Sequence, residues 1–136
     1  MAALNAPEDD ILVIMPADHW IEDSSEFNQI IQTASKIAAS EDCWVTFGIN
    51  PTEPQTGYGY IKADKEFNFS KIEGQNIDQF TEKPDRNKAL EFIKDKRYTW
   101  NSGMFLFKAK KVLNEFNSFS LDILNSCKKS IQNSTI

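Results

Sequence analysis

The stretch Ile11–Met15, which reads Ile-Leu-Val-Ile-Met and is closed by Pro16, decides the fold class. A continuous apolar run of this length predicts a strand buried on both faces of a parallel sheet. A second strand of the same kind is predicted over Trp44–Ile49. Helical periodicity fills the segment between them, so the order strand, helix, strand indicates a βαβ unit, whose crossover is nearly always right-handed.

The start and the buried side of this helix can both be read from the sequence. Asp23 stands three residues before Glu26, which resembles a capping box with aspartate in place of serine or threonine. Apolar residues then recur at helical spacing and form one stripe; they are Phe27, Ile30, Ile31, Ala34, Ile37 and Ala38. We therefore expect a helix that follows Asp23 and buries this stripe.

The rest of the chain alternates shorter strands with helices. Strands are expected at Tyr58–Ala63, Asn76–Lys83 and Tyr98–Lys108, with a further short strand or hairpin arm at Phe67–Ile72. Asp85 can cap a helix whose inner face carries Ala89, Leu90, Phe92 and Ile93, and one or two helices are expected between Ala109 and Gln132. The fold class is therefore α/β with a mixed sheet.

Length and charge limit the possible functions. The chain has 136 residues, the size of one domain, and its 15 Lys and Arg against 20 Asp and Glu give a net charge of −5. Nucleic acids and anionic membranes require a positive surface, so neither is expected as a partner. The N-terminal segment lacks the basic and apolar regions of a signal peptide. A cytoplasmic location is the default, with Cys43 and Cys127 both reduced and buried.

The five glycines form none of the common nucleotide-binding loops. They make neither G-x-G-x-x-G nor G-x-x-x-x-G-K-[ST], and the fragment Gly57-Tyr58-Gly59 precedes a strand rather than a helix. A Rossmann dinucleotide site and a P-loop are therefore excluded by the sequence.

An acidic residue follows the first predicted strand. Asp18 stands within Pro16-Ala17-Asp18-His19, at the carboxyl end of that strand. Ligands of open α/β sheets bind at this edge, so Asp18 is a candidate metal ligand; a turn or cap residue is the alternative. His19 is the sole histidine, which excludes a histidine metal cluster or a catalytic triad. The simplest role for His19 is to support the turn at Asp18.

Glu82-Lys83-Pro84 is a second candidate. Proline holds the preceding backbone extended and so fixes where Glu82 and Lys83 point. A carboxylate beside an ammonium suits a phosphorylated sugar, because Glu82 can accept hydrogen bonds from hydroxyls while Lys83 neutralises the phosphate. The alternative is an ordinary exposed ion pair, which contributes about 0–1 kcal/mol.

Two further segments could line a ligand site. Gly59 and Tyr60 begin a strand, and glycine, which has no Cβ, lets a ligand approach the backbone; a simple turn is the alternative. Asn101 and Ser102 place small polar groups inside a hydrophobic strand, where they need hydrogen-bond partners. Sugar hydroxyls would be suitable partners, and a β-bulge is the alternative.

Five motifs in a fixed order resemble a known family. They are Pro16–His19, Thr46–Thr52, Thr56–Ile61, Phe80–Asp85 and Trp100–Phe105. Their order and spacing resemble the mannose-1-phosphate guanylyltransferases, a branch of the sugar nucleotidyltransferase family, over roughly residues 1–120. The resemblance implies a Rossmann-like, GT-A-like three-layer α/β/α nucleotidyltransferase fold with a mixed sheet, of which this chain holds an incomplete part.

The resemblance also implies a reaction and the roles of individual residues. In this family an oxygen of a sugar 1-phosphate attacks the α-phosphate of a nucleoside triphosphate. Here GMP would pass from GTP to mannose 1-phosphate, with Mg²⁺ as cofactor, to give GDP-mannose and pyrophosphate. By resemblance, Asp18 binds the metal, Lys83 contacts the sugar phosphate and Glu82 holds sugar hydroxyls, with Asp18 and Lys83 as the catalytic pair. Gly59, Tyr60, Asn101 and Ser102 would line the sugar site.

The family pattern is present only in part. Its Gly-rich nucleotide loop precedes the first motif and its second metal aspartate follows the last, and neither has a match here. Residues 1–136 are therefore expected to form a single partial domain with little turnover of its own. Two other functions stay open, a non-catalytic sugar-phosphate-binding or assembly module and a nucleotidyltransferase for another hexose 1-phosphate. A homodimer is expected before a monomer, because an exposed sheet edge can pair with a second copy.

Overall fold

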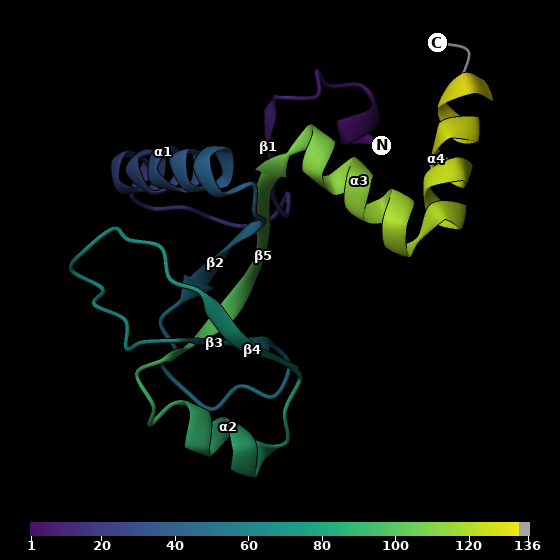
Figure 1. Cartoon of the computed structure of the whole chain (residues 1–136). Helices are drawn as coiled ribbons and strands as arrows, with labels where there is room; N and C mark the ends of the chain where they lie inside the picture. The colour runs from purple at the N-terminus through teal and green to yellow at the C-terminus, as the bar shows by residue number, and fades with distance from the viewer. Residues whose placement is uncertain (134–136) are drawn as a thin grey trace. The chain divides into compact units, whose positions relative to one another are not determined.

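A computed structural model describes residues 1–133 of the chain (Figure 1). In chain order, its elements are the 3₁₀ helix η1 (Ala2–Leu4), β1 (Ile11–Ile14), α1 (Ser24–Glu41), β2 (Val45–Ile49), β3 (Gly59–Ala63), β4 (Ile77–Glu82), α2 (Arg86–Phe92), β5 (Tyr98–Lys108), α3 (Ala109–Phe119) and α4 (Leu121–Asn133). The order strand, helix, strand predicted for the first part of the chain is confirmed, as are the strands β3, β4 and β5 and a pair of C-terminal helices.

Residue contacts divide the chain into two compact units. Of the described residues, the first unit contains Met1–Ile14, Ala34–Val45 and residues 105–133, and the second contains Met15–Thr33 and Thr46–Met104. All the candidate site residues belong to the second unit.

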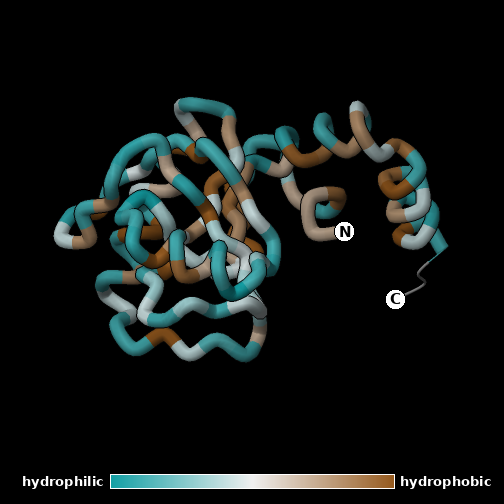
Figure 2. Tube along the Cα trace, turned by 90° about the horizontal axis from the view of Figure 1, so that it is seen from below, coloured by the Kyte–Doolittle hydropathy of each residue, from teal (hydrophilic) through white to brown (hydrophobic). Residues whose placement is uncertain are grey.

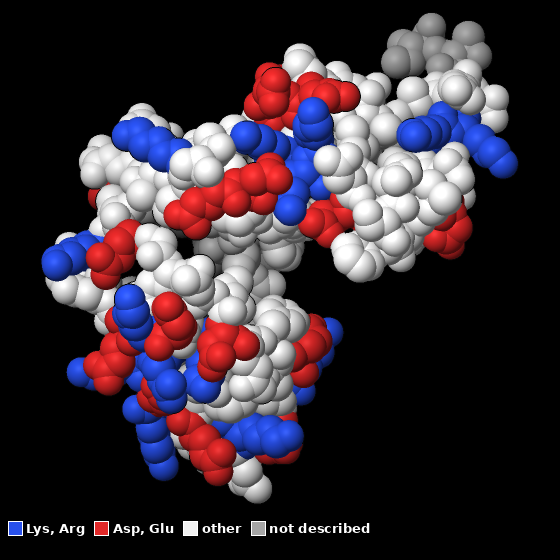
Figure 3. All heavy atoms as spheres, viewed as in Figure 1, with Lys and Arg blue, Asp and Glu red and all other residues white. Residues whose placement is uncertain are grey.

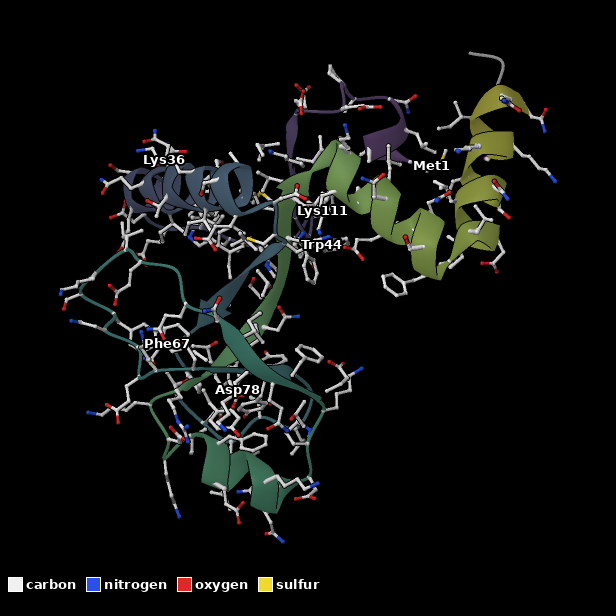
Figure 4. The ribbon with its side chains drawn as sticks, viewed as in Figure 1. Met1, Lys36, Trp44, Phe67, Asp78 and Lys111 are labelled. Carbon is white, nitrogen blue, oxygen red and sulfur yellow. The ribbon has the colours of Figure 1, made fainter. Side chains whose placement is uncertain are left out.

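The first unit is built on an antiparallel strand pair and an apolar cluster. β1 pairs with the second half of β5, with Ile11 opposite Lys108 and Ile14 opposite Phe105. Its core consists of Ala3, Phe107, Ala109 and Val112. Trp44, labelled in Figure 4, packs on Phe107 with ring centroids 4.6 Å apart. Hydrophobic and hydrophilic bands alternate along α3 and α4, as Figure 2 shows, which is the pattern of helices with one apolar side.

The second unit contains an antiparallel sheet in which β3 is central. β3 pairs with β4 on one side and with the first half of β5 on the other. The helix α2 lies against this sheet through Phe92, whose ring centroid is 5.3 Å from that of Tyr60 and 4.2 Å from that of Tyr98. The predicted cap of α2 is confirmed, since the Lys88 backbone N–H donates to Asp85 Oδ1 at 2.9 Å.

The start and the stripe of α1 also follow the sequence pattern. The backbone N–H of Glu26 donates to Asp23 Oδ1 at 2.8 Å, which satisfies one of the free amides of the first turn. Ala34 and Ala38 of the predicted stripe are buried. Aspartate therefore caps this helix as the sequence predicts.

The predicted burial of the first two strands on both faces is wrong, since Ile49 of β2 is 46% exposed and β1 is also partly open. Ile11, Leu12 and Val13 are half-buried, and Ile14 is 42% exposed. The physical reason is the pairing, because β1 lies antiparallel to β5, and antiparallel strands are not covered on both faces as parallel strands are.

Two further local predictions are wrong. Residues 67–72 form turns rather than a strand, because Asn68 Oδ1 accepts the backbone N–H of Ser70 at 3.1 Å and the Lys71 N–H bonds to the Asn68 carbonyl at 2.9 Å. Phe67, labelled in Figure 4, lies in this loop between β3 and β4. On α2, Leu90 is 36% exposed and does not lie on the inner face, which Ala89 occupies.

The two cysteines differ from the prediction only in their burial. Cys43 and Cys127 are both free thiols, as predicted, but half-buried rather than buried. Burial raises the pKa of the Cys43 thiol above its ordinary value.

Among residues 1–133, no helix combines the length and the apolar character needed to cross a bilayer.

Candidate functional site

The sheet of the second unit has two faces with different contents. In antiparallel strands, residues directly opposite each other share a face, and alternate residues along a strand share it too. One face, here called the Glu82 face, carries Gly59, Glu82, Phe80 and Thr99. The other, here called the Tyr60 face, carries Tyr60, Thr81, Tyr98 and Trp100.

Gly59 and Glu82 meet on the Glu82 face. The two residues are directly paired between β3 and β4. A Cβ placed on Gly59 would lie 2.8 Å from Glu82 Oε2 and 2.8 Å from Phe80 Cζ, closer than real Cβ contacts. The missing side chain of glycine leaves the space into which the ends of the Glu82 and Phe80 side chains reach, and an alanine here would displace both of them.

Lys83 adopts a backbone conformation that the sequence does not predict. Its φ is +45°, in the left-handed region, where a non-glycine residue costs about 1–3 kcal/mol. The expectation that Pro84 holds Lys83 extended is therefore wrong. A tertiary contact overrides the local preference, since the Lys83 N–H donates to the Tyr58 carbonyl at 3.1 Å. Backbone strain thus coincides with a residue that the sequence selects for function.

The side chains of Glu82 and Lys83 remain accessible. Lys83 Nζ lies 3.4 Å from Glu82 Oε1, and the side chains of Lys83 and Glu82 are 64% and 55% exposed. An ion pair this exposed stabilises the fold little. Both groups are consequently available to a ligand that can satisfy the carboxylate and the ammonium separately.

Lys62 and Asp78 of this unit form an ion pair. Lys62 Nζ lies 2.9 Å from Asp78 Oδ2, and its hydrogen bond holds the pKa of Asp78 below the ordinary value. Asp78 is labelled on β4 in Figure 4. In Figure 3, acidic and basic side chains are interspersed over the face of the second unit that is shown. Recognition of an anion would therefore depend on individual side chains such as Lys83 rather than on a broad positive patch.

Asn101 is held by the neighbouring strand. Thr46 Oγ1 of β2 lies 2.9 Å from Asn101 Oδ1 and 3.0 Å from the Met104 carbonyl oxygen, so its proton is placed between two acceptors. Within residues 1–133 the Nδ2 amide of Asn101 has no hydrogen-bond partner. Asn101 and Thr99 are two residues apart along β5, so Asn101 lies on the Glu82 face. Its Nδ2 amide is available there as a hydrogen-bond donor.

The segment that carries Asp18 lies against β5. A Cβ on Gly103, whose φ is +74°, would be 3.7 Å from Pro16 Cγ, two residues before Asp18. Trp100, which pairs with Tyr60, is three residues from Gly103 on the same strand, a rise of about 10 Å. Asp18 and His19 are both exposed, and Asp18 lies in the turn that follows β1. β5 therefore contacts the segment that carries Asp18 and also pairs with β3, which in turn pairs with β4, the strand that ends at Glu82.

Tyr60 and Ser102 are not brought to the ligand side by their side chains. Tyr60 is fully buried on the Tyr60 face, and its hydroxyl donates to the Gln55 carbonyl at 2.9 Å. Ser102 is 5% exposed, and its Oγ accepts the Met104 N–H at 3.2 Å. In both residues the polar group is already satisfied by the backbone, so the structure gives them roles in the fold.

Sequence reasoning missed two residues next to this site. Thr46 holds Asn101, and Phe80 stands two residues before Glu82 on the same face. Strand alternation was the available signal for Phe80, because residues 80 and 82 must share a face wherever residues 77–82 form a strand. The hydrogen bond between Thr46 and Asn101 joins residues 55 positions apart, and no local sequence pattern predicts it.

Comparisons with known proteins assign the chain to a family. A family model described as nucleotidyl transferase matches residues 1–135. The chain belongs to the nucleotidyl transferase family. This nucleotidyl transferase chain is 40% identical over 134 residues to a mannose-1-phosphate guanylyltransferase of Klebsiella pneumoniae. It is 42% identical over 127 residues to the alginate biosynthesis protein AlgA of Pseudomonas aeruginosa. The resemblance drawn from the five motifs is confirmed.

Solved structures confirm the α/β fold class of this nucleotidyl transferase chain. A crystal structure of mannose-6-phosphate isomerase from Helicobacter pylori matches 96% of the chain with a TM-score of 0.81 and 33% identity, and the match covers 48% of that structure. A second, titled mannose-1-phosphate geranyltransferase, from Thermus thermophilus, matches 92% of the chain with a TM-score of 0.76 and 29% identity, over 36% of its own length.

The chain is much shorter than its curated relatives. The alignments cover 96% and 93% of this chain but only 28% and 26% of the Klebsiella and Pseudomonas proteins. The activities in the names of these relatives therefore belong to polypeptides more than three times as long as the matched segment.

Proposed function

We propose that the Glu82 face binds the sugar 1-phosphate of a nucleotidyltransferase that transfers GMP from GTP to mannose 1-phosphate. The observation that carries the proposal is the exposed pair of Glu82 and Lys83 at the end of β4, beside the glycine that makes room for the carboxylate. The name of the Klebsiella relative supports mannose 1-phosphate as the acceptor and guanylate as the group transferred.

The chemistry requires positioning rather than a covalent intermediate on the protein. A phosphate oxygen of the sugar 1-phosphate forms a bond to the α-phosphorus of the triphosphate, and the bond from that phosphorus to the bridging oxygen of pyrophosphate breaks. Lys83 neutralises the attacking phosphate, while Glu82 and the free amide of Asn101 orient the sugar through its hydroxyls. Holding the phosphate in line with its target lowers the barrier without any group on the chain being transformed.

Asp18 is the residue of this chain that would hold Mg²⁺. Magnesium is a hard cation that binds through one or two carboxylates and completes its shell with water and substrate phosphates, and the exposed Asp18 carboxylate has that chemistry. Among residues 1–133 no cluster of three or more His, Cys, Asp or Glu is placed to hold a metal alone. The cation, when bound, neutralises phosphate charge at the site of transfer.

The test is a titration of mannose 1-phosphate with Mg²⁺ into the wild type and the Lys83→Ala variant. A charge-assisted hydrogen bond contributes about 1.5–3 kcal/mol, so we expect the Kd of Lys83→Ala to rise by about tenfold or more. Lys88→Ala is the matched control, because Lys88 is also exposed but lies on α2 beyond the Tyr60 face. Equal affinities for wild type and Lys83→Ala would contradict the proposal.

The choice of sugar has its own measurement. Titrating glucose 1-phosphate beside mannose 1-phosphate compares two ligands with the same phosphate and different hydroxyl geometry. Tighter binding of mannose 1-phosphate, lost in Glu82→Gln, is the expected result. Tighter binding of glucose 1-phosphate would assign the site to a different hexose.

A further inference from the structure

Phe80 is a large apolar side chain exposed beside the candidate sugar site. It is 52% exposed on β4, whereas Ile61, which is directly opposite on β3, is 4% exposed. Phe80 Cζ and Glu82 Oε2 each lie 2.8 Å from the position that a Cβ of Gly59 would take. The edge of the phenyl ring and the carboxylate therefore flank one point on the Glu82 face.

This arrangement has the two chemical properties that a hexose ring requires. A hexose presents hydroxyls at its edge and C–H groups on its faces. Glu82 accepts hydrogen bonds from the hydroxyls, and an aromatic ring can cover the C–H surface, as small-molecule sites combine apolar walls with a few polar groups. Covering Phe80 would also remove exposed apolar area from water.

We propose that Phe80 contacts the hexose ring of the bound sugar 1-phosphate and contributes to its affinity. The inference rests on the proposed function, because it assigns Phe80 to the same ligand as Glu82 and Lys83. It goes beyond that function in separating the sugar contact from the phosphate contact. Phe80 recognises the carbohydrate, and Lys83 recognises the phosphate.

The same strand offers a matched control. Ile77 is also 52% exposed on β4, but it pairs with Ala63 at the opposite end of the strand, across the register shift between Lys62 and Ala63. Replacing Ile77 with alanine removes a similar amount of exposed apolar surface without touching the space at Gly59. A general effect of losing apolar surface from this edge strand would therefore appear in both variants.

The experiment compares wild type, Phe80→Ala, Phe80→Leu, Ile77→Ala and Lys83→Ala by NMR titration with two probes, mannose 1-phosphate and inorganic phosphate. We expect Phe80→Ala to bind mannose 1-phosphate about three- to tenfold more weakly while its affinity for inorganic phosphate is unchanged. Phe80→Leu, which keeps an apolar side chain of similar size and removes the ring, is expected to lie between wild type and Phe80→Ala. The signals of the Phe80 ring should shift when mannose 1-phosphate, but not inorganic phosphate, is added to wild type.

The two proposals fail in different ways. If Lys83→Ala weakens binding but Phe80→Ala binds mannose 1-phosphate as wild type does, the inference about Phe80 is overturned and the proposed function stands. If Phe80→Ala weakens both probes equally, or if Ile77→Ala weakens mannose 1-phosphate as much, Phe80 acts through the fold and the inference is again overturned. If Lys83→Ala binds both probes like wild type, the proposed function itself is wrong.

Discussion

The two faces of the sheet formed by β3, β4 and the first half of β5 use their side chains differently. On the Tyr60 face, rings of Tyr60 and Tyr98 pack against Phe92 of α2, and the Tyr60 hydroxyl is bonded to the backbone. On the Glu82 face, the Glu82 carboxylate and the Phe80 ring are more than half exposed. Ile61 and Thr99 on the Glu82 face are buried, so a ligand-binding candidate has to be on that face and also be exposed, as Phe80 and Glu82 of β4 are.

Adjacent residues of one sequence motif can have different roles in this sheet. Gly59 and Tyr60 are adjacent in the sequence, yet one makes room for Glu82 and the other is in the core. Asn101 and Ser102 divide in the same manner, since Asn101 keeps a free amide and Ser102 is satisfied by the backbone. Substitutions that act on one face only can test this division.

Gly59→Ala is expected to have the largest effect. The new Cβ would collide with Glu82 Oε2 and Phe80 Cζ, each 2.8 Å away. Both atoms lie at the ends of exposed side chains that can move aside, so the free energy of unfolding should fall only slightly, while displacing the carboxylate should weaken mannose 1-phosphate binding about tenfold or more. Urea unfolding and calorimetric titration measure the two effects.

Gly57→Ala is the control for that variant. A Cβ at Gly57 would meet no atom within 4 Å, so neither stability nor affinity should fall. If Gly59→Ala kept the affinity of wild type, the Glu82 face would not be the place where the sugar binds.

Tyr60→Phe is expected to act on the fold alone. Removing the hydroxyl deletes its hydrogen bond to the Gln55 carbonyl, a loss of about 1 kcal/mol in the free energy of unfolding. The affinity for mannose 1-phosphate should be unchanged, because the side chain faces α2. A tenfold loss of affinity at unchanged stability would show that the division between the faces is wrong.

Asp95→Asn is expected to give the smallest effect, and one that depends on pH. Arg97 Nη2 donates a hydrogen bond to Asp95 Oδ2 at 2.7 Å. This bond holds the pKa of the Asp95 carboxyl below its ordinary value. A carboxyl with a lowered pKa in the folded state stabilises the fold above its unfolded pKa of about 4, and this contribution is lost as the pH falls through the folded value. The ion pair between Asp95 and Arg97 is partly exposed. At neutral pH the free energy of unfolding of wild type should therefore exceed that of the variant by less than about 1 kcal/mol. The difference should vanish in acid; one that grew as the pH fell would contradict this assignment.

Local patterns predict the parts of the fold that local physics determines. Asp23 and Asp85 cap their helices as expected, because a side-chain oxygen three residues ahead of a free amide is a short-range contact. The burial of β1 could not be predicted, since it depends on its pairing with β5, a strand far along the sequence.

The candidate site was predictable in its residue types but not in its geometry. The sequence identifies Glu82, Lys83 and Asn101 by their chemistry. It fails at Lys83, where the bond to Tyr58, the residue before β3, accompanies a left-handed backbone that proline would disfavour. Nor could the burial of the Tyr60 side chain be predicted, because the packing of α2 decides which face is covered. In each case a contact between segments distant in the sequence overrides a local rule.

The most direct test of the central claim is a map of NMR chemical-shift changes as mannose 1-phosphate is added to the wild-type chain. We expect the largest changes at the backbone amides of Gly59, Glu82 and Lys83 and at the side-chain amide of Asn101, with the ring signals of Phe92 and Tyr98 unmoved. Changes concentrated on α2 and the Tyr60 face, or no changes at millimolar sugar phosphate, would contradict it.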